Sequence, residues 1–302
     1  MEQKTFGRYR VTGELGRGAM GTVYRAVDPL IEREVAIKTL LPTLPPEVMA
    51  EVRERFLREA KSAGRMNHPN VVTIFDVGEQ DGVAYMAMEI LQGRSLQQVL
   101  REEPRLPFER IADLVAQVAD ALDYAQQFQI VHRDVKPANV MVNDGWHAKL
   151  VDFGVAYVPS STMTQTGTAL GSPRYMSPEQ VLGLPVDPRS DIFSLGVVLY
   201  EALTGVAAFD GDNVNAIMYA TVNSSPPPPS SHNRLVPAML DGVGRCAQLM
   251  ELGSGHVRPP RKRKGADREA TEPKAESTRP RTGRAGRPPD PTPCRPEATA
   301  RR

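Results

Sequence analysis

Three side chains that can act on a phosphoryl group stand close together in the segment His132-Arg133-Asp134-Val135-Lys136-Pro137-Ala138-Asn139 of this 302-residue chain. The carboxylate of Asp134 can accept the proton of a substrate hydroxyl. Lys136 can stabilise charge on a transferred phosphoryl group, and the amide oxygen of Asn139 is a ligand that Mg²⁺ accepts. The spacing therefore predicts phosphoryl transfer, and the alternative is a polar loop that holds an ordinary buried salt bridge.

Three glycines near the N-terminus predict a loop that approaches phosphate. Gly16, Gly18 and Gly21 stand in the run Gly16-Arg17-Gly18-Ala19-Met20-Gly21-Thr22-Val23. Glycines allow backbone N–H groups to face a phosphate closely. A dinucleotide-binding fold requires a helix after such glycines, whereas a β-branched segment follows here. The pattern favours strand–loop–strand, as in protein kinases, and a plain hairpin turn is the alternative.

Three further charged residues extend the predicted phosphate site. Lys38 ends the strand-like run Val35-Ala36-Ile37-Lys38, from which its ammonium group can reach phosphates; a solvated surface lysine is the alternative. Asp152 begins Asp152-Phe153-Gly154, 13 residues after Asn139, and offers a second hard oxygen ligand for Mg²⁺. Glu59 is the acid that we expect to pair with Lys38.

The periodicity of apolar residues indicates the elements that position these side chains. Strands are expected at about 9–12, 22–27, 34–40, 71–77 and 83–91, with one helix at about 47–66 that Pro45 and Pro46 open. From about residue 95 to 252 the spacing becomes helical, with one helix over about 111–128 and another around 192–199. Strands first and helices second predict an α+β fold.

The composition changes after residue 252. Residues 253–302 carry 14 Lys+Arg against 6 Asp+Glu, nine prolines and no aromatic residue, whereas residues 1–252 have a net charge of −7. Such a segment cannot bury enough apolar surface to fold, so we expect a disordered basic tail at 253–302. Its basic run at 261–264 resembles a patch for nucleic acid or an anionic surface, but no aromatic residue offers base stacking. We therefore expect no specific nucleic-acid partner.

Composition also excludes several classes of protein. The apolar share of 40% supports a packed core, so a wholly disordered chain is excluded. Two cysteines cannot form a disulfide framework and are typical of a reducing compartment. The N-terminus has no apolar signal-peptide region, and no uninterrupted apolar stretch reaches the roughly 18 residues of a transmembrane helix. We expect no membrane segment and a cytoplasmic location.

With these motifs in this order, the sequence resembles the Hanks-type (eukaryotic-like) serine/threonine protein kinases, most closely the bacterial receptor-kinase branch. The resemblance covers about residues 6–250 and implies a bilobal fold over residues 6–252. A small antiparallel β lobe would span about 6–91 and a mainly helical large lobe about 92–252. It implies transfer of the γ-phosphoryl group of ATP, with Mg²⁺ or Mn²⁺, to serine and threonine hydroxyls of proteins in signalling.

The resemblance also implies roles for single residues. The catalytic set is Asp134 as base, with Lys136, Lys38 and Glu59; the metal ligands are Asn139 and Asp152. Asp191 would hold the catalytic-loop backbone, and Ser172 would lie near the base in the substrate loop. The residues expected around ATP, with Met88 as gatekeeper, are Leu15, Gly16, Gly18, Gly21, Val23, Ala36, Lys38, Met88, Glu89 and Leu91.

The loop at 160–168 is rich in hydroxyl groups. Arg133 precedes the expected base, as in kinases that phosphorylation of this loop activates. We predict autophosphorylation at Thr164 and Thr166, with self-association for that step, because a phosphate there adds a charge of about −1.5 to −2 that can pair with Arg133. The alternative is a flexible loop rich in serine and threonine.

The sequence departs from the family near its end. Ser177-Pro178-Glu179 stands where the family usually has Ala-Pro-Glu, and no arginine stands at a matching place to pair with Glu179. Gly242 and Gly244 disfavour a helix after residue 241, and the last family helix is absent. We expect an incomplete large lobe, from truncation or a frameshift in the gene. The alternative function is therefore a catalytically impaired, pseudokinase-like scaffold.

Overall fold

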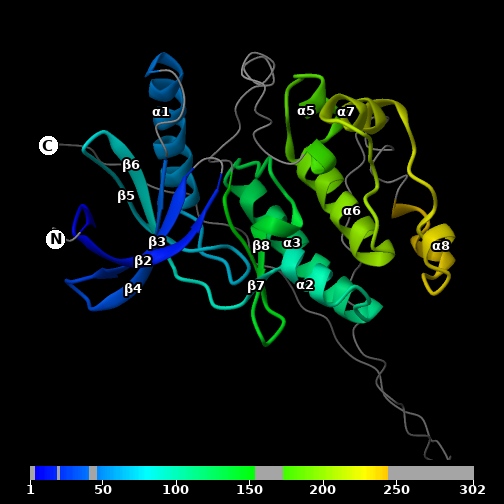
Figure 1. The fold of residues 1–302 in the computed structure, drawn as a ribbon, viewed down its shortest axis with the longest axis horizontal. Coiled ribbons are helices and arrows are strands. Elements are labelled where there is room, and N and C mark those ends of the chain that lie inside the picture. Colours follow the sequence, from blue (N-terminus) through cyan, green and yellow to red (C-terminus); the bar gives the residue numbers. More distant parts are fainter. Residues whose placement is uncertain (1–3, 19–20, 41–45, 154–172, 244–302) are drawn as a thin grey trace, which may run out of the picture. The chain divides into compact units, whose positions relative to one another are not determined.

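The structure is a computed structural model, and it describes residues 4–18, 21–40, 46–153 and 173–243. It divides into the units Met1–Ser254 and Gly255–Arg302, and every described residue lies in the first unit. In that unit an N-terminal antiparallel sheet is followed by a mainly helical part (Figure 1). The predicted α+β class, with a small antiparallel β part followed by a mainly helical part, is confirmed.

The sheet has the strand order β1-β2-β3-β4-β6-β5. Its strands are β1 (Thr5–Phe6), β2 (Tyr9–Arg17), β3 (Thr22–Asp28), β4 (Arg33–Thr39), β5 (Ile74–Gln80) and β6 (Val83–Met88). On one face Val35 and Ile37 are buried in a cluster with Tyr9 and Tyr85. On the other face Ala36 is buried with residues of helix α1 (Pro46–Ala63). Lys38 follows the same alternation as Ala36, so it lies on the face that α1 covers.

The helical part packs around a second core. Its larger helices are α2 (Leu96–Glu102), α3 (Phe108–Gln127), α6 (Pro188–Thr204) and α7 (Val214–Asn223), with short α5 (Pro178–Val181) and α8 (Pro229–His232). Strands β7 (Arg94–Ser95), β8 (Val140–Val142) and β9 (Ala148–Leu150) form a small sheet beside it. Three 3₁₀ turns complete the elements: Pro137–Asn139, Pro173–Tyr175 and Ala238–Leu240. The apolar stripe of α3 packs against α6 and β9, and this core fixes the loops between them. Figure 1 shows α3 beside α6.

The hairpin of β8 and β9 carries the only tryptophan of the chain in its turn. Trp146 has a φ of 60°, and Gln117 Nε2 of α3 donates a hydrogen bond to its carbonyl oxygen at 3.0 Å. The Arg110 guanidinium, also from α3, lies 4.6 Å from the centre of the indole ring. These contacts tie the turn to α3.

Three strand boundaries differ from those predicted, and strand β1 was not predicted. The strand expected at about 9–12 continues to Arg17 as β2. The strand expected at 71–77 is observed three residues later because Asp81 and Gly82, with φ of 52° and 75°, close a two-residue turn directly after Gln80. Val71 instead forms an isolated parallel bridge with Leu150. The strand expected at 83–91 ends at Met88, since residues 89–93 run on as an irregular link between the two lobes.

The helix predicted at 47–66 is observed as α1, and that predicted at 111–128 as α3. After the 3₁₀ turn at Ala238–Leu240 the description ends at residue 243, so the expected incomplete lobe and the basic tail lie outside the described residues. Of the helices that are described, none combines the length and the apolar character that crossing a bilayer requires.

Candidate active site

Lys38 lies near the end of strand β4, from which its side chain reaches Asp152 in the segment after β9. Lys38 pairs in register with Val23 on one side and Met86 on the other, so its backbone position is fixed on both edges. Its Nζ lies 2.7 Å from Asp152 Oδ1, and only 12% of the lysine side chain is exposed. Burial alone would raise the pKa of the Asp152 carboxyl, but the Lys38 ammonium, with smaller contributions from His132 and Lys136, holds that pKa below its usual value.

The catalytic-loop segment brings Asp134, Lys136 and Asn139 together, as predicted. Lys136 Nζ donates to Asp134 Oδ2 at 2.7 Å, and Asn139 Nδ2 donates to the same oxygen at 2.9 Å and to the Asp134 carbonyl at 2.8 Å. Asp134 Oδ1 has no partner in the described part of the chain, and 41% of this side chain is exposed. One carboxylate oxygen is therefore oriented by neighbours while the other remains available to an incoming hydroxyl.

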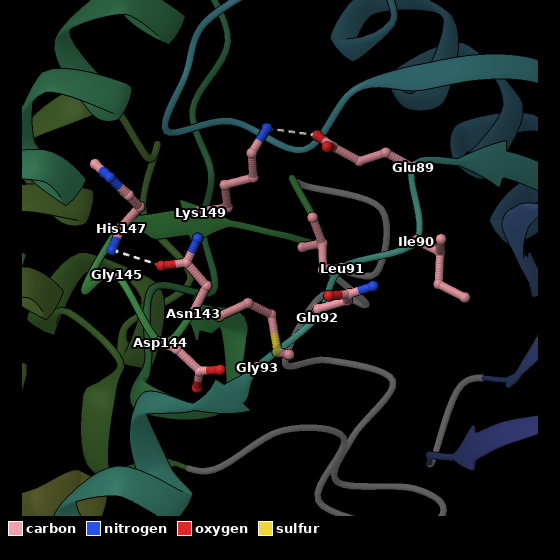
Figure 2. Close-up of a pocket in the computed structure, with 11 residues that line it drawn as sticks. Glu89, Ile90, Leu91, Gln92, Gly93, Asn143, Asp144, Gly145, His147 and Lys149 are labelled. Carbon is pink, nitrogen blue, oxygen red and sulfur yellow. Dashed lines mark hydrogen bonds and ion pairs between the residues drawn. The ribbon is translucent and has the colours of Figure 1, made fainter.

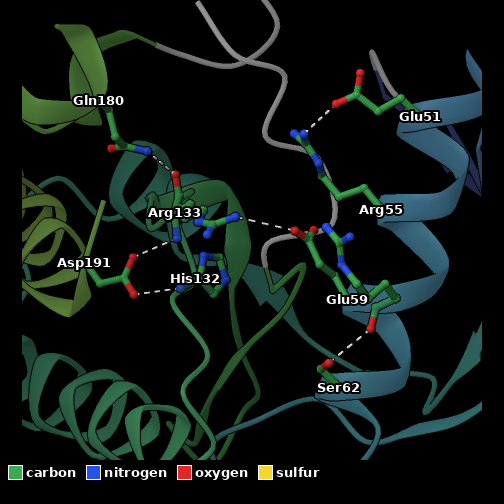
Figure 3. A network of polar contacts seen from close by, with 9 residues as sticks. Glu51, Arg55, Glu59, Ser62, His132, Arg133, Gln180 and Asp191 are labelled. Atoms are coloured by element: carbon green, nitrogen blue, oxygen red, sulfur yellow. Dashed lines mark hydrogen bonds and ion pairs between the residues drawn. The ribbon is translucent and has the colours of Figure 1, made fainter. Parts of the chain in front are cut away.

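The backbone before Asp134 is held by side chains from other elements (Figure 3). The Asp191 carboxylate of α6 accepts hydrogen bonds from the His132 and Arg133 amides, both at 2.7 Å, which agrees with the role expected for it. Burial raises the pKa of this carboxyl above its ordinary value although the two amides oppose the shift. The His132 ring is fully buried; its Nε2 lies 2.8 Å from the Val151 carbonyl, and its Nδ1 accepts from the Asp134 amide at 3.2 Å.

The expected ion pair between Lys38 and Glu59 is not formed, and this prediction is wrong for the state described. Glu59 Oε1 instead accepts from Arg133 Nη1 at 3.4 Å (Figure 3). Its Oε2 is buried without a hydrogen-bond partner among the described residues. Burial raises the pKa of the Glu59 carboxyl, while Arg133, Arg55 and Arg58 act in the opposite direction. Sequence spacing predicts Glu59 on the inner side of α1, but in the described state its ion-pair partner is Arg133, and Lys38 pairs with Asp152 instead.

The glycine loop is observed as the hairpin between β2 and β3. The Gly18 amide donates to the Gly21 carbonyl at 2.8 Å, and Gly16 pairs with Val23 in the ladder. A Cβ at Gly21 would lie 1.7 Å from the Thr39 carbonyl oxygen at the end of β4. Only glycine therefore fits where this end of the loop approaches β4. Leu15 of β2, which is predicted to contact ATP, is 45% exposed.

The link between the lobes contains the residues predicted to contact adenine. Met88 ends β6 opposite Ala36, and both are buried. The Glu89 amide donates a hydrogen bond to the Thr73 carbonyl at 2.9 Å, so it is not available to a ligand. Within the described residues the Glu89 carbonyl and the Leu91 amide have no partner, so an acceptor and a donor remain for a ligand.

A pocket of about 390 Å³ lies between this link and the β8–β9 hairpin (Figure 2). Its wall includes Glu89 and Leu91 but none of the predicted glycine-loop residues, so it borders the predicted ATP cleft and does not coincide with it. Lys149 Nζ lies 2.7 Å from Glu89 Oε1 at its edge. Lys149 and Met141 also line the pocket, and neither was predicted, because a lysine and a methionine on a short strand carry no local signal.

Asn139 and Asp152 have the donor atoms that a hard divalent cation requires. Asn139 is 6% exposed and uses its Nδ2 on Asp134, which leaves its amide oxygen for a ligand. The Val151 amide donates to the Asn139 carbonyl at 2.9 Å, so the two candidate ligands lie on adjacent segments. Two protein oxygens suit Mg²⁺, which takes its remaining ligands from phosphate and water. No cluster of three His, Cys, Asp or Glu side chains suitable for a metal occurs among the described residues.

Several predicted residues lie outside the described ranges, namely Gly154, Thr164, Thr166 and Ser172. Glu179 makes no ion pair with any described residue, in agreement with the missing arginine. It is not isolated, however, since the Ser190 hydroxyl from the first turn of α6 donates a hydrogen bond to Glu179 Oε1. This contact reduces the cost that an uncompensated carboxylate would have there.

A family model described as protein kinase domain matches residues 9–239. A probable serine/threonine-protein kinase of Corynebacterium efficiens is 42% identical over 232 residues, which are 74% of this chain and 35% of the relative. The serine/threonine-protein kinase PrkC of Bacillus subtilis is 38% identical over 238 residues, or 78% of this chain and 36% of PrkC. The crystal structure of the Mycobacterium tuberculosis PknI kinase domain matches with a TM-score of 0.65 and 32% identity, covering 81% of this chain and 89% of that domain. The chain spans just over a third of the length of the curated relatives it matches.

Proposed function

The chain belongs to the protein kinase domain family, and from this premise we propose that it is an ATP-dependent serine/threonine protein kinase. One observation supports the proposal most: Lys38 from the sheet meets Asp152 at 2.7 Å, beside a loop in which Lys136 and Asn139 both orient Asp134. A lysine for the phosphates, a carboxylate for the metal and a base for the hydroxyl are the parts that phosphoryl transfer needs.

The proposed reaction transfers the γ-phosphoryl group of ATP to a serine or threonine hydroxyl. The hydroxyl oxygen forms a bond to the γ-phosphorus, the bond from that phosphorus to the β,γ-bridging oxygen breaks, and ADP leaves. The hydroxyl proton passes to Asp134, whose Oδ1 has no partner among the described residues. Lys136, 2.7 Å from Asp134 Oδ2, is placed to stabilise charge on the transferred group.

ATP would lie between the glycine loop and the link at residues 89–91. The Glu89 carbonyl and the Leu91 amide offer the acceptor and donor for adenine, and Met88 and Ala36 line the inner end of the site. Asn139 and Asp152 would hold Mg²⁺ or Mn²⁺, which supplies neutralising charge for the phosphates when bound. Lys38 would then form ion pairs with both Asp152 and the phosphates.

Phosphorylation of Thr164 and Thr166 is part of the proposal. A phosphate on that loop would compete with Glu59 for Arg133, since a phosphate offers a stronger partner than the 3.4 Å contact to Glu59 Oε1. Release of Glu59 would leave it free to approach Lys38, the pair on which active kinases depend. Autophosphorylation would need transient association of two copies of the chain.

The experiment that tests the function is phosphotransfer from Mg²⁺–ATP to a serine- and threonine-containing protein, followed by mass spectrometry. We expect Asp134→Asn to lower the rate by roughly 10²–10⁴-fold while ATP still binds. Asp144→Asn is the matched control, because Asp144 is an exposed acid in the β8–β9 turn. A wild-type rate equal to that of Asp134→Asn would refute the kinase proposal.

That refuting outcome would favour the scaffold alternative. Its structural support is the absence of the Lys38–Glu59 pair in the described state. A scaffold would retain the fold and interactions with protein partners without phosphotransfer. Measured ATP binding without turnover in the same preparation would identify it.

A further inference from the structure

Gln180 of α5 joins the start of that helix to the catalytic loop through both ends of its carboxamide. Its Oε1 accepts from the Ser177 amide at 3.0 Å, and its Nε2 donates to the Arg133 carbonyl at 2.7 Å (Figure 3). Only 3% of the residue is exposed. A buried amide with both ends used has one well-defined orientation, so its position relative to the loop is fixed.

The Arg133 carbonyl belongs to the peptide group immediately before Asp134. The N–H of the same peptide group donates to His132 Nδ1 at 3.2 Å, so the group is held at both edges, by Gln180 and by His132. Arg133 has a φ of 66°, a left-handed conformation that is unfavourable for arginine without outside support. The Asp191 carboxylate supports the two amides that precede this peptide.

We infer that Gln180 is a positioning residue for the proposed base Asp134, acting through the Arg133–Asp134 peptide group; this inference rests on the proposed function. Lys136 and Asn139 orient the carboxylate of Asp134, whereas Gln180, His132 and Asp191 fix the backbone from which that carboxylate projects. Without the Gln180 donor, the Arg133 carbonyl loses this 2.7 Å hydrogen bond, and the peptide group is held less firmly in the left-handed geometry.

The second function that Gln180 could have is to cap α5, and the two roles are separable. In the capping box the Gln180 amide donates to Ser177 Oγ at 3.4 Å. Ser177→Ala removes that bond but keeps the bond from Gln180 to Arg133. It is therefore the matched control: if α5 capping were all that mattered, Ser177→Ala and Gln180→Met would have the same effect.

The test compares the full-length wild type, Gln180→Met and Ser177→Ala in steady-state phosphotransfer. We expect Gln180→Met to lower kcat roughly 10–100-fold with an unchanged KM for ATP, because a small misplacement of a catalytic group acts on the chemical step. Ser177→Ala should retain kcat. Wild-type kcat in Gln180→Met, or an equal loss in Ser177→Ala, would overturn the inference.

A third variant, Gln180→Glu, gives a readout that helix stability alone would not move. A protonated glutamic acid can donate to the Arg133 carbonyl, whereas an ionised one cannot. We expect its kcat, relative to wild type at each pH, to rise as the pH falls, while the ratio for Gln180→Met stays flat. The other titratable groups near the site, including His132, Asp191, Glu59 and Asp134, are present in all three proteins, and the ratio for the uncharged variant Gln180→Met controls for their titration. A flat ratio for Gln180→Glu would overturn the inference.

Hydrogen exchange tests the same inference without turnover, and it applies even where a variant is less stable. Peptides covering 130–139 should lose protection in Gln180→Met while peptides of α3 keep theirs. Equal loss in both regions would indicate general destabilisation and would contradict a positioning role. A wild-type chain no faster than Asp134→Asn would refute the proposed function and the inference together, whereas an active wild type with a fully active Gln180→Met refutes only the inference.

Discussion

At the scale of single residues, Asp152 is charged in a place where burial opposes a charge. Its pKa is held below the usual value because Lys38 lies 2.7 Å from it. An acid with a lowered folded pKa stabilises the fold above its unfolded pKa, near 3.9 for aspartate, and loses that contribution as the pH falls through the folded value. The pair is thus both a candidate catalytic element and a pH-dependent source of stability.

We predict that Lys38→Met lowers the free energy of unfolding by roughly 1–3 kcal/mol at pH 7, with the loss shrinking toward pH 4. In the variant, burial without the lysine raises the pKa of Asp152, so stability falls as the pH rises. Urea unfolding of both proteins from pH 4 to 7 measures the difference. Adding Asp152→Asn to Lys38→Met should abolish its pH dependence, and Lys149→Met is a matched control that breaks another lysine–carboxylate pair. A difference that is constant with pH would contradict the prediction.

The residues that sequence predicts well are those whose chemistry depends on close spacing. Asp134, Lys136 and Asn139 lie within six positions, and the structure brings them into contact. Asp191 was assigned correctly only through the resemblance to a family. The partner of Glu59 was not predictable, because Arg133 is 74 positions away and the choice between it and Lys38 depends on where α1 lies.

At the scale of elements, α1 carries a carboxylate that pairs with Arg133 in the described state, whereas the proposed reaction would need it beside Lys38. Glu59 has a raised pKa and one buried oxygen without a partner among the described residues, so its charge is poorly compensated in the described state. A raised folded pKa contributes stability at low pH that is lost as the pH rises. The ionised Glu59 carboxylate therefore does not stabilise the fold near neutral pH, and we expect its role to be in catalysis.

We predict that Glu59→Gln changes the free energy of unfolding at pH 7 by less than about 1 kcal/mol, while phosphotransfer falls at least roughly tenfold. The amide keeps the shape but cannot pair with Lys38 as an anion. Glu51→Gln is the control, since Glu51 is an exposed acid of the same helix that pairs with Arg55. Thermal unfolding and initial phosphotransfer rates, measured on the same preparation of each protein, test both parts of the prediction. Unchanged activity with a large loss of stability would indicate a structural role.

The helix α3 provides the apolar face on which the catalytic loop rests. We predict that Leu114→Ala, at a site only 2% exposed, lowers the free energy of unfolding by about 2–5 kcal/mol in urea. Leu182→Ala, at a site 55% exposed, should change it by less than about 0.5 kcal/mol. Similar losses at both sites would contradict the described core.

At the scale of the whole molecule, the predicted site draws entirely on the unit Met1–Ser254. The switch from alternating to helical periodicity near residue 95 predicted its two-part architecture, since each period reports which face of an element is buried. The end of β6 at Met88 was not predictable, because apolar residues continue through Ile90 and Leu91 into the link. The composition identifies the basic tail at 253–302 but does not predict any regular structure within it.

We predict that deleting residues 255–302 leaves the unfolding temperature and the phosphotransfer rate on an uncharged peptide unchanged. Every described residue of the site and of the buried clusters precedes the deletion, and the removed segment contains no Leu, Ile, Met or aromatic residue that could contribute substantial burial. Differential scanning fluorimetry and the rate assay on the shortened and full-length chains test this. A lower unfolding temperature would show that the segment packs on the folded unit.

Because of its position, Trp146 reports on the large lobe through intrinsic fluorescence, without an added label. As the sole tryptophan, it accounts for emission excited near the red edge of protein absorption, and its ring lies beneath the Arg110 guanidinium in a turn next to the pocket behind the interlobe link. Separation of the hairpin from α3 removes that cation and admits water, which changes emission wavelength and intensity. Stopped-flow fluorescence can therefore time the opening of this lobe separately from any event in the sheet.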